Sequence, residues 1–302
     1  MGSNVLSMAL SKDRFCSFKC SYPKDFNDPY ELFLTIDFQQ VPEMLATYKD
    51  TIGEMPQYPT TCFSKSPSVI PMWAHYAHNH TGVVVEIDED ILNEKLPDIQ
   101  FGDVSYKDSP DEGLLDMLAR ACHIGKPRYH FFLQRGVFSA AYYTKHTSWS
   151  YEQERRLVAN DKLVTTFNDI MLLEFPIECI SSLIVGHRAD KKTKGMVSKL
   201  ADIINANFYE MKIGKTNAIP YYIDTDDITF KFDSGSIVKC TNTCKECNEP
   251  LSEGCDVCSW CAIDEGHETT VARRNPLRLL QEIGELDAYY KRMMDIGKKH
   301  EK

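Results

Sequence analysis

The chain has 302 residues, of which 43% are hydrophobic and 26% charged, and its formal net charge is −10. This is the composition of a globular protein with enough apolar material for a sizeable core. The acidic balance argues against broad electrostatic capture of nucleic acid or of an anionic membrane. No run approaches 18 apolar residues, and the N-terminus lacks the features of a signal peptide. We therefore expect a cytoplasmic protein without a membrane span.

Apolar runs and helical periodicities alternate along residues 1–236, which predicts a domain of the α+β class. The first predicted elements are a strand at 14–18, a helix at 38–50, a strand at 60–64, a short helix at 72–77, strands at 83–87 and 101–106, and helices at 112–124 and 128–145. The later ones are a strand from residue 157, strands at 171–175 and 179–186, an amphipathic helix at 191–208, and strands at 208–211, 219–223 and 228–232.

The segment 25–31 carries strong turn chemistry, because Asx side chains cap the backbone and Pro29 fixes its own φ. Two interpretations are open. Asp28 and Glu31 are typical of the first turn of a helix that Pro29 opens. In the other interpretation, Asn27 and Asp28 belong to a functional site.

Two glutamates, Glu152 and Glu154, stand one residue apart just before an apolar run that predicts a strand. On a strand, both side chains would project from the same face. Adjacent carboxylates repel each other and raise at least one pKa, so the pair predicts either nearby cations or a reaction. One interpretation is therefore a catalytic pair. The other is a set of salt bridges on a solvated sheet face with the arginines Arg135, Arg155 and Arg156.

The composition changes near residue 237, where a cysteine-rich segment predicts a zinc ribbon at 237–268. Two CxxC pairs supply the expected ligands, Cys244, Cys247, Cys258 and Cys261. Thiolates at this spacing converge on one tetrahedral ion, and four protein ligands leave no open position, so the expected zinc is structural. Cys240 and Cys255 also lie at ligand-like spacings, and their role stays open.

Residues 240–268 contain one lysine and seven acidic residues, the reverse of what phosphate binding requires. We therefore expect the ribbon to be a protein-interaction or folding module and not a nucleic-acid binder. The C-terminal segment 269–302 predicts one amphipathic helix at 270–298, which Asn275 caps and Pro276 opens. Such a helix docks on its own domain or on a protein partner.

Four motifs resemble those of a bacterial family, domain of unknown function 2971. They are Phe26-Asn-Asp-Pro-Tyr-Glu31, Cys62-Phe-Ser64, Met72-Trp-Ala-His-Tyr76 and Trp149-Ser-Tyr-Glu-Gln-Glu-Arg-Arg156. Their order and approximate spacing agree over residues 13–225. The family brings no established reaction with it.

A looser resemblance is to the ADP-ribosyltransferases, whose fold is a split pair of small sheets that grips NAD. It implies a mixed or antiparallel split-sheet domain with flanking helices. It also implies cleavage of the glycosidic bond of NAD, with transfer to an unknown acceptor, as in a bacterial toxin or antiphage defence protein. Glu154 would then be the catalytic carboxylate, Glu152 would position or deprotonate the acceptor, and Ser64 would end the middle strand of the family's three-part signature.

The residues that the two resemblances place around NAD are Arg14, Asn27, Asp28, Ser64, Trp73, His75 and Tyr76. The chain departs from the pattern at its start, because the family usually has an upstream strand with an aromatic–basic–aromatic element and almost nothing precedes Val5. Arg14 is the candidate to replace that element.

The sequence is also compatible with other functions. A metal-dependent nuclease would gather a divalent ion on Asp28, Glu31, Glu152 and Glu154. A non-catalytic sensor or scaffold would bind a protein partner through the zinc ribbon. Purely structural interpretations also exist for the aromatic residues. Trp73 and Trp149 are typical core anchors, and His75 is typical of packing or capping.

Overall fold

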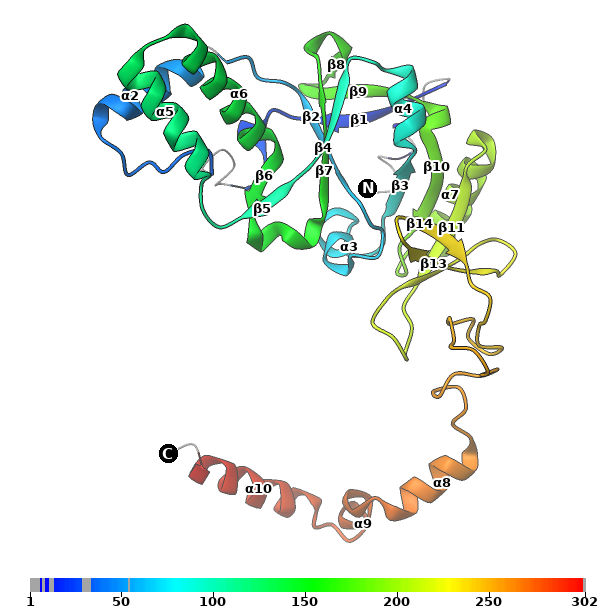
Figure 1. Cartoon of the computed structure of the whole chain (residues 1–302). Coiled ribbons are helices and arrows are strands. Elements are labelled where there is room, and N and C mark those ends of the chain that lie inside the picture. The colour runs from blue at the N-terminus through cyan, green and yellow to red at the C-terminus, as the bar shows by residue number, and fades with distance from the viewer. Residues whose placement is uncertain (1–5, 7–8, 11–13, 29–33, 54, 301–302) are drawn as a thin grey trace. The chain divides into compact units, whose positions relative to one another are not determined.

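The computed structural model describes residues 6, 9–10, 14–28, 34–53 and 55–300 (Figure 1). The chain forms two compact units. The first comprises Met1–Ile213 and Ile219–Lys239, and the second comprises Gly214–Ala218 and Cys240–Lys302. The short segment 214–218 therefore belongs to the cysteine-rich unit, although residues of the first unit flank it on both sides.

Two three-stranded antiparallel sheets form one part of the first unit. The first has the order β1 (Phe15–Cys20), β9 (Ile170–Pro176) and β8 (Val164–Phe167). The second has the order β2 (Thr60–Ser64), β7 (Glu154–Ala159) and β4 (Ile99–Asp103). A bridge between Ser21 and Thr60 joins the end of β1 to the start of β2. The strand β5 (Ser105–Lys107), which follows β4 in the chain, forms a parallel pair with β6 (Thr144–His146).

A six-stranded sheet forms the other part of the first unit. Its order is β14 (Ser236–Lys239), β13 (Thr229–Asp233), β12 (Tyr221–Ile223), β11 (Asn207–Lys212), β10 (Ile180–Val185) and β3 (Val83–Ile87). The central strands β10 and β11 are parallel, and helix α7 (Lys191–Ile204) makes the crossover that a parallel pair requires. Asp190 caps this helix, and Asn205 ends it in the left-handed conformation. Several small sheets with mainly antiparallel pairing confirm the predicted fold class.

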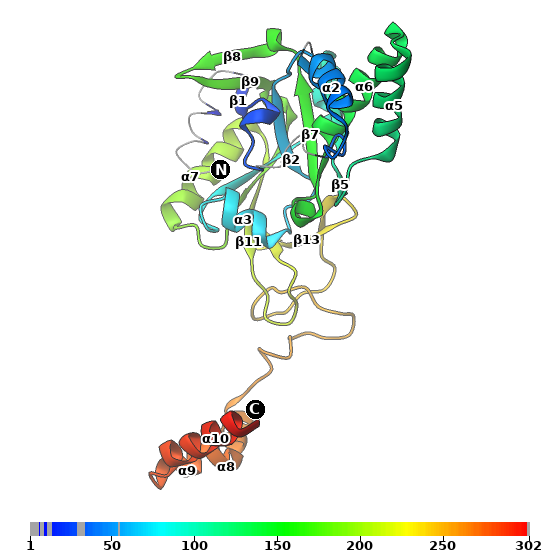
Figure 2. The same cartoon turned by 90° about the vertical axis from the view of Figure 1, so that its left-hand side faces the viewer.

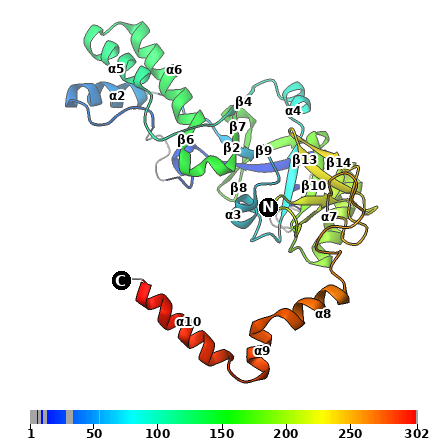
Figure 3. The same ribbon diagram turned by 60° about the horizontal axis from the view of Figure 1, so that its bottom comes forward.

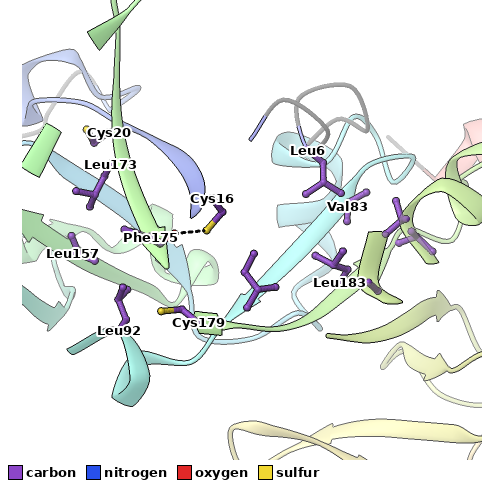
Figure 4. Close-up of a cluster of buried hydrophobic side chains, with 14 of the residues drawn as sticks. Leu6, Cys16, Cys20, Val83, Leu92, Leu157, Leu173, Phe175, Cys179 and Leu183 are labelled. Atoms are coloured by element: carbon purple, nitrogen blue, oxygen red, sulfur yellow. Dashed lines mark hydrogen bonds between the residues drawn. The ribbon is translucent and has the colours of Figure 1, made fainter. Parts of the chain in front are cut away.

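The largest hydrophobic core joins the sheets of the first unit (Figure 4). Leu157 of β7, Phe175 of β9 and Leu183 of β10 are fully buried in it. Cys16 and Cys179 also pack there, and the thiol of Cys16 donates to the carbonyl of Phe175 at 3.5 Å. These cysteines therefore act as small apolar residues, because burial raises the pKa of Cys16 to about 12.

Three helices pack together as a group in the first unit (Figures 2 and 3). They are α2 (Pro42–Gly53), α5 (Glu112–Ile124) and α6 (Pro127–Tyr143). They share a separate core that includes Met44, Leu118 and Leu133. Gly136 permits the close approach of α5 to α6, since a Cβ at this position would lie 2.4 Å from the side chain of Leu114.

The remaining elements of the first unit are short. They are α3 (Ile70–Tyr76), α4 (Glu89–Lys95) and the 3-10 helices η1 (Pro23–Asp25), η2 (Thr147–Glu152), η3 (Asp161–Leu163) and η4 (Ile177–Cys179). Among these, η2 ends at Glu152, and a single residue, Gln153, separates it from β7.

The second unit contains the cysteine-rich ribbon and three helices, α8 (Glu265–Arg274), α9 (Pro276–Glu282) and α10 (Leu286–His300). The prediction of one helix over 270–298 is therefore wrong. Pro276 has no N–H to continue α8, and Asn275 instead caps α9 by accepting from the backbone of Leu277. Gly284, with a φ of 76°, separates α9 from α10. Across the described residues, no helix has the length and apolar character to span a membrane.

Candidate functional site

The candidate site lies on the sheet formed by β2, β7 and β4, where Ser64 is the direct cross-strand partner of Glu154. Directly opposed residues of an antiparallel pair project from the same face. The next pair on that face joins Cys62 to Arg156. The sheet thus brings the second and fourth sequence motifs together on one surface. The Ser64 hydroxyl itself is occupied, because it donates to the carbonyl of Ser66 at 3.3 Å.

The two glutamates do not share a strand, so the predicted strand geometry is wrong for this pair. Glu152 ends the 3-10 helix η2, and Glu154 begins β7. Gln153 between them adopts the left-handed conformation, with a φ of 47° and a ψ of 50°. This backbone reversal, and not the alternation of a strand, brings the two carboxylates to one place. Both residues are only 3% exposed.

The carboxylates meet at a buried lysine. Lys145 Nζ lies 2.6 Å from Glu152 Oε2 and 3.2 Å from Glu154 Oε2. Arg156 adds a second cation, with its Nε 2.8 Å from Glu154 Oε1. Two positive and two negative side chains thus form one buried cluster, which we call the ion cluster (Glu152, Glu154, Lys145 and Arg156). Salt bridging to Arg156 was one of the two predicted interpretations, but the cluster is buried and not on a solvated face.

The cluster holds Glu154 in its ionised form. Burial by itself would raise the pKa of this carboxyl, but the hydrogen bond and charge of Arg156, together with the charge of Lys145, lower the pKa below its usual range. Mutual repulsion of the carboxylates therefore does not control Glu154, contrary to the expectation from their spacing. The guanidinium of Arg156 is completely buried, and its Nη1 donates to the carbonyl of Tyr142 at 3.0 Å.

The neighbouring arginines have other partners. Arg155 projects from the opposite face of the sheet and forms ion pairs with Glu89 and with Asp103, the latter at 2.8 Å. Arg135 makes no ion pair with a described residue. Of the three arginines that the sequence offered as partners for the glutamates, Arg156 alone pairs with either of them among the described residues.

Aromatic side chains enclose the Glu152 end of the cluster. The hydroxyl of Tyr76 donates to Glu152 Oε1 at 2.7 Å. Burial, together with this hydrogen bond to an anion, raises the pKa of Tyr76. Trp149 lies beside Lys145, with its ring centroid 4.6 Å from Nζ. Tyr76 was a predicted site residue, and the structure places it in direct contact with a predicted catalytic one.

The other predicted NAD-contacting residues are more dispersed. Trp73 is 1% exposed, and its indole N–H donates to the carbonyl of Pro67 at 2.6 Å, so it packs as a core anchor. His75 is exposed and lies against the ring of Tyr151. Arg14 is exposed just before β1, and its carbonyl accepts from Ile177. Among the described residues, none of these three side chains contacts the ion cluster.

The two turn residues differ in exposure: Asn27 is exposed and Asp28 is buried. Asp28 lines a cavity of about 400 Å³ that Trp149 and His146 also line. In the same cavity, His146 Nδ1 lies 2.9 Å from the Ser148 hydroxyl, and its Nε2 lies 3.4 Å from Asp108. The backbone N–H of Ser148 also donates to Nδ1, so this histidine caps η2. Glu31 lies outside the described residues.

Two residues of the site were missed by sequence reasoning. Lys145 precedes Glu152 by seven positions on a different element, so no spacing rule connects them. Cys62 was noted only as part of a motif, yet its thiol hydrogen-bonds the Glu154 carboxylate. The residue keeps exposed surface, while its thiol is packed among protein atoms and burial raises its pKa. Its position next to Arg156 in the register could not be known before the pairing of β2 with β7.

The second unit contains a separate cluster of cysteines that could hold a metal ion. The Sγ atoms of Cys244, Cys247, Cys258 and Cys261 all lie within 4.8 Å of one another. The Sγ atoms of Cys247 and Cys258 are 3.8 Å apart, close to the spacing of about 3.8 Å that tetrahedral Zn–S bonds of about 2.3 Å produce. The predicted choice of four cysteines is confirmed as the set that can hold a metal ion such as zinc.

The surroundings of these thiols also fit a metal. The backbone N–H groups of Cys258 and Cys261 donate to Cys244 Sγ and Cys258 Sγ, each at 3.3 Å. Such donors favour thiolates, and the hydrogen bond from Cys258 lowers the pKa of Cys244 to about 6. Bound zinc would close the ribbon as a four-ligand structural site. Cys255 is exposed and, like Cys240, lies outside this cluster.

One acid of the ribbon has a structural role that composition did not reveal. Glu249 is 3% exposed and accepts hydrogen bonds from the backbone of Lys215 and from the backbone and hydroxyl of Thr216. These contacts fix the segment 214–218 to the ribbon. Gly214 is required at its start, because a Cβ there would lie 2.2 Å from the Glu249 carboxylate.

Among the described residues, the four cysteines are the one group of three or more His, Cys, Asp or Glu side chains close enough to share a metal. The described acids of the nuclease hypothesis, Asp28, Glu152 and Glu154, do not form such a group. The cations of the ion cluster already neutralise two of them.

Comparison with known families agrees with the motifs. Residues 72–157 match the model of DUF2971, a protein family of unknown function. This segment is similar to that family over the matched residues. It includes most of α3, the helices α5 and α6, Lys145 and most of β7, and so contains all four residues of the ion cluster. The predicted resemblance to this family is confirmed over these residues. No curated protein and no solved structure gave a match to the chain.

Proposed function

We propose that the first unit is an ADP-ribosyltransferase-like enzyme that cleaves the glycosidic bond of NAD, with Glu154 as its catalytic carboxylate. The observation that carries the proposal is the cross-strand pairing of Ser64 with Glu154. The resemblance requires a strand that ends in serine to lie beside a strand that begins with the second glutamate. Nothing in the sequence spacing demanded this pairing, because ninety positions and nine described elements separate the two residues.

The electrostatics of Glu154 suit that role. A carboxylate that faces the positive charge developing on the ribose as nicotinamide leaves must stay ionised. Arg156 and Lys145 keep Glu154 ionised. In the proposed reaction the bond between the ribose C1′ and the nicotinamide nitrogen breaks, and its electron pair leaves with nicotinamide. A nucleophilic atom of the acceptor then bonds to C1′ and releases its proton.

Glu152 is the proposed partner of the acceptor. Its carboxylate receives the shorter of the two contacts from Lys145 and the hydroxyl of Tyr76. A ligand that reaches Glu154 would therefore displace the longer contact of Lys145, at 3.2 Å, and leave Glu152 in place. The exposed surface of Cys62, whose thiol contacts Glu154, is the proposed side of approach.

The test is the release of nicotinamide from NAD by the purified chain, followed chromatographically. Glu154→Asp keeps the charge that Arg156 requires but withdraws the carboxylate, and should lower the rate by about 100-fold or more. The matched control is Glu89→Gln, which breaks an ion pair on the opposite face of the same sheet and should leave the rate within about threefold. Equal rates in the Glu154→Asp variant and the parent, or no release from the parent with any added bacterial protein, would refute the proposal.

The acceptor is a further part of the proposal. Transfer to a bacterial macromolecule would make the protein a toxin or an antiphage effector, as the resemblance implies. Expression of the parent chain should then slow growth of a bacterial host, and the Glu154→Asp variant at equal abundance should not. Growth inhibition that persists in this variant would separate toxicity from the reaction.

A specific observation supports a second role, in which the second unit binds a protein partner. Exposed apolar side chains follow one another along its helices, namely Val271, Leu279, Ile283, Tyr290, Met293, Met294 and Ile296. Large exposed apolar surfaces are typical of interaction sites. Co-purification of a defined partner should be lost on Met294→Glu and on Cys244→Ser, and retained in Glu154→Asp. A partner that binds all three variants equally does not use this unit.

A further inference from the structure

A cavity of about 370 Å³ lies in the first unit between α6 and the end of β7. Its wall includes Tyr58 and Phe138, and its floor includes Val158. Val158 is four residues beyond Glu154 on β7, so the cavity lies at the far end of that strand from the ion cluster. Tyr142, near the end of α6, packs with Val158 in one hydrophobic cluster. The cavity is thus distinct from the proposed catalytic site.

The apolar wall is a fixed aromatic surface. The ring of Phe138 stacks on that of Tyr142 at 4.5 Å, and the ring of Tyr58 meets Phe138 edge-on at 5.7 Å. The hydroxyl of Tyr142 accepts from the backbone N–H of Tyr58 at 2.7 Å, which fixes the loop before β2 against α6. A planar ligand would meet side chains that need no rearrangement to receive it.

Three polar side chains beside this wall are exposed and make no hydrogen bond or ion pair with another described residue. They are the amide of Gln100, the carboxylate of Asp98 and the guanidinium of Arg135, which line the same cavity. By contrast, the neighbouring amide of Gln134 donates to the carbonyl of Thr51 at 3.1 Å and is committed to the fold. An amide, a carboxylate and a guanidinium beside aromatic rings form a combination with a definite ligand preference.

We propose that this cavity binds a purine nucleoside monophosphate of the adenine type. A glutamine amide can donate and accept at the same time, which matches the amino group and ring nitrogen at one edge of adenine. A carboxylate accepts hydrogen bonds from ribose hydroxyls. A guanidinium pairs with phosphate through parallel hydrogen bonds. Gln100 therefore reads the base, Asp98 the ribose and Arg135 the phosphate, while Phe138 and Tyr58 cover the ring.

The proposal goes beyond the proposed reaction, because it needs neither Glu154 nor cleavage of NAD. The experiment is calorimetric titration of the full chain with adenosine 5′-monophosphate. Gln100→Leu keeps the side-chain volume and removes the hydrogen bonds, and Arg135→Ala removes the phosphate partner. Each should weaken binding by about tenfold or more. Arg120→Ala, an exposed arginine of α5 outside the cavity, is the matched control and should bind within about twofold of the parent.

Two further ligands separate the contacts. Adenosine should bind more weakly than its monophosphate, and Arg135→Ala should not weaken it further. Guanosine monophosphate should bind less well than adenosine monophosphate to the parent, and the difference should vanish in Gln100→Leu. The Glu154→Asp variant should bind adenosine monophosphate as the parent does. Absence of binding to the parent at millimolar concentration would overturn the proposal. So would binding by Gln100→Leu and by Arg135→Ala as tight as that of the parent.

Discussion

Replacing Glu154 with glutamine removes one of the two negative charges that balance Lys145 and Arg156 in the ion cluster. The guanidinium of Arg156 is completely buried, so it cannot turn to water when its partner is lost. Breaking a buried ion pair in this way costs about 3–5 kcal/mol. The glutamine oxygen can still accept one hydrogen bond from Arg156, so we expect the lower figure, about 3 kcal/mol. For a unit of this size that corresponds to a fall in Tm of roughly 6–12 °C.

Thermal and urea unfolding of the parent and variant measure this loss. The same experiment has an internal check, because Lys145→Met removes the cation that bridges both glutamates. In the Lys145→Met background the two carboxylates repel each other without a lysine between them, so Glu154→Gln should cost less there. The loss of stability in the double variant should therefore be smaller than the sum of the two single losses by about 1 kcal/mol or more. A loss below about 1 kcal/mol for Glu154→Gln, or strictly additive effects, would refute the description of the cluster as one coupled unit.

Three further predictions follow from other parts of the chain. The rings of His80 and His187 lie 4.9 Å apart, and burial lowers the pKa of both below the ordinary 6.5. The unfolded chain therefore binds more protons than the folded one, and the free energy of unfolding should fall as the pH drops below about 6.5. Urea unfolding at pH 7.5 and pH 5.5 measures this, and an equal pH dependence in His187→Gln would contradict it. Zinc should be retained at one ion per chain in Cys255→Ser and lost in Cys244→Ser, as a colorimetric metal-release assay would show, and a chelator should unfold the second unit alone. Gly186→Ala should destabilise the protein by about 1–3 kcal/mol, because the added Cβ would lie 2.1 Å from the carbonyl oxygen of His80. The control Gly195→Ala in α7 adds a Cβ that meets open space, and it should be neutral or stabilising. Equal unfolding midpoints for the two variants would show that the backbone at Gly186 moves to accept the Cβ without cost.

The metal ligands show how far local spacing can reach. Two CxxC pairs place their thiols by short-range geometry, since each pair needs only a tight turn to converge. The four cysteines predicted from spacing are the four that cluster in the structure. Strand and helix patterns succeeded for the same reason in segments such as 60–64 and 83–87, where the apolar run and its turns lie within a few residues.

The geometry of the glutamate pair could not be predicted from the sequence, because it depends on long-range contacts. The spacing of Glu152 and Glu154 suggested a strand with repelling carboxylates, whereas the left-handed Gln153 and the buried Lys145 give a neutralised cluster. The left-handed conformation of Gln153 cannot be predicted from its residue type, because this conformation favours glycine and asparagine. The C-terminal helix was also predicted as one piece, although Pro276 and Gly284 were visible breaks, because the apolar stripe continues across both.

The sequence by itself determined the α+β class, the four cysteines that can hold a metal, and the two motifs, 72–76 and 149–156, that fall in the match to DUF2971, since each depends on residues close together in the chain. Only the tertiary structure decided that Ser64 lies opposite Glu154, that Arg156 and not Arg135 or Arg155 neutralises it, and that Lys145 joins both glutamates. The physical reason is the register of β2 against β7. A shift of one residue in that register would place Cys62 and Ser64 on the opposite face from Glu154 and Arg156, and no local rule selects between the two.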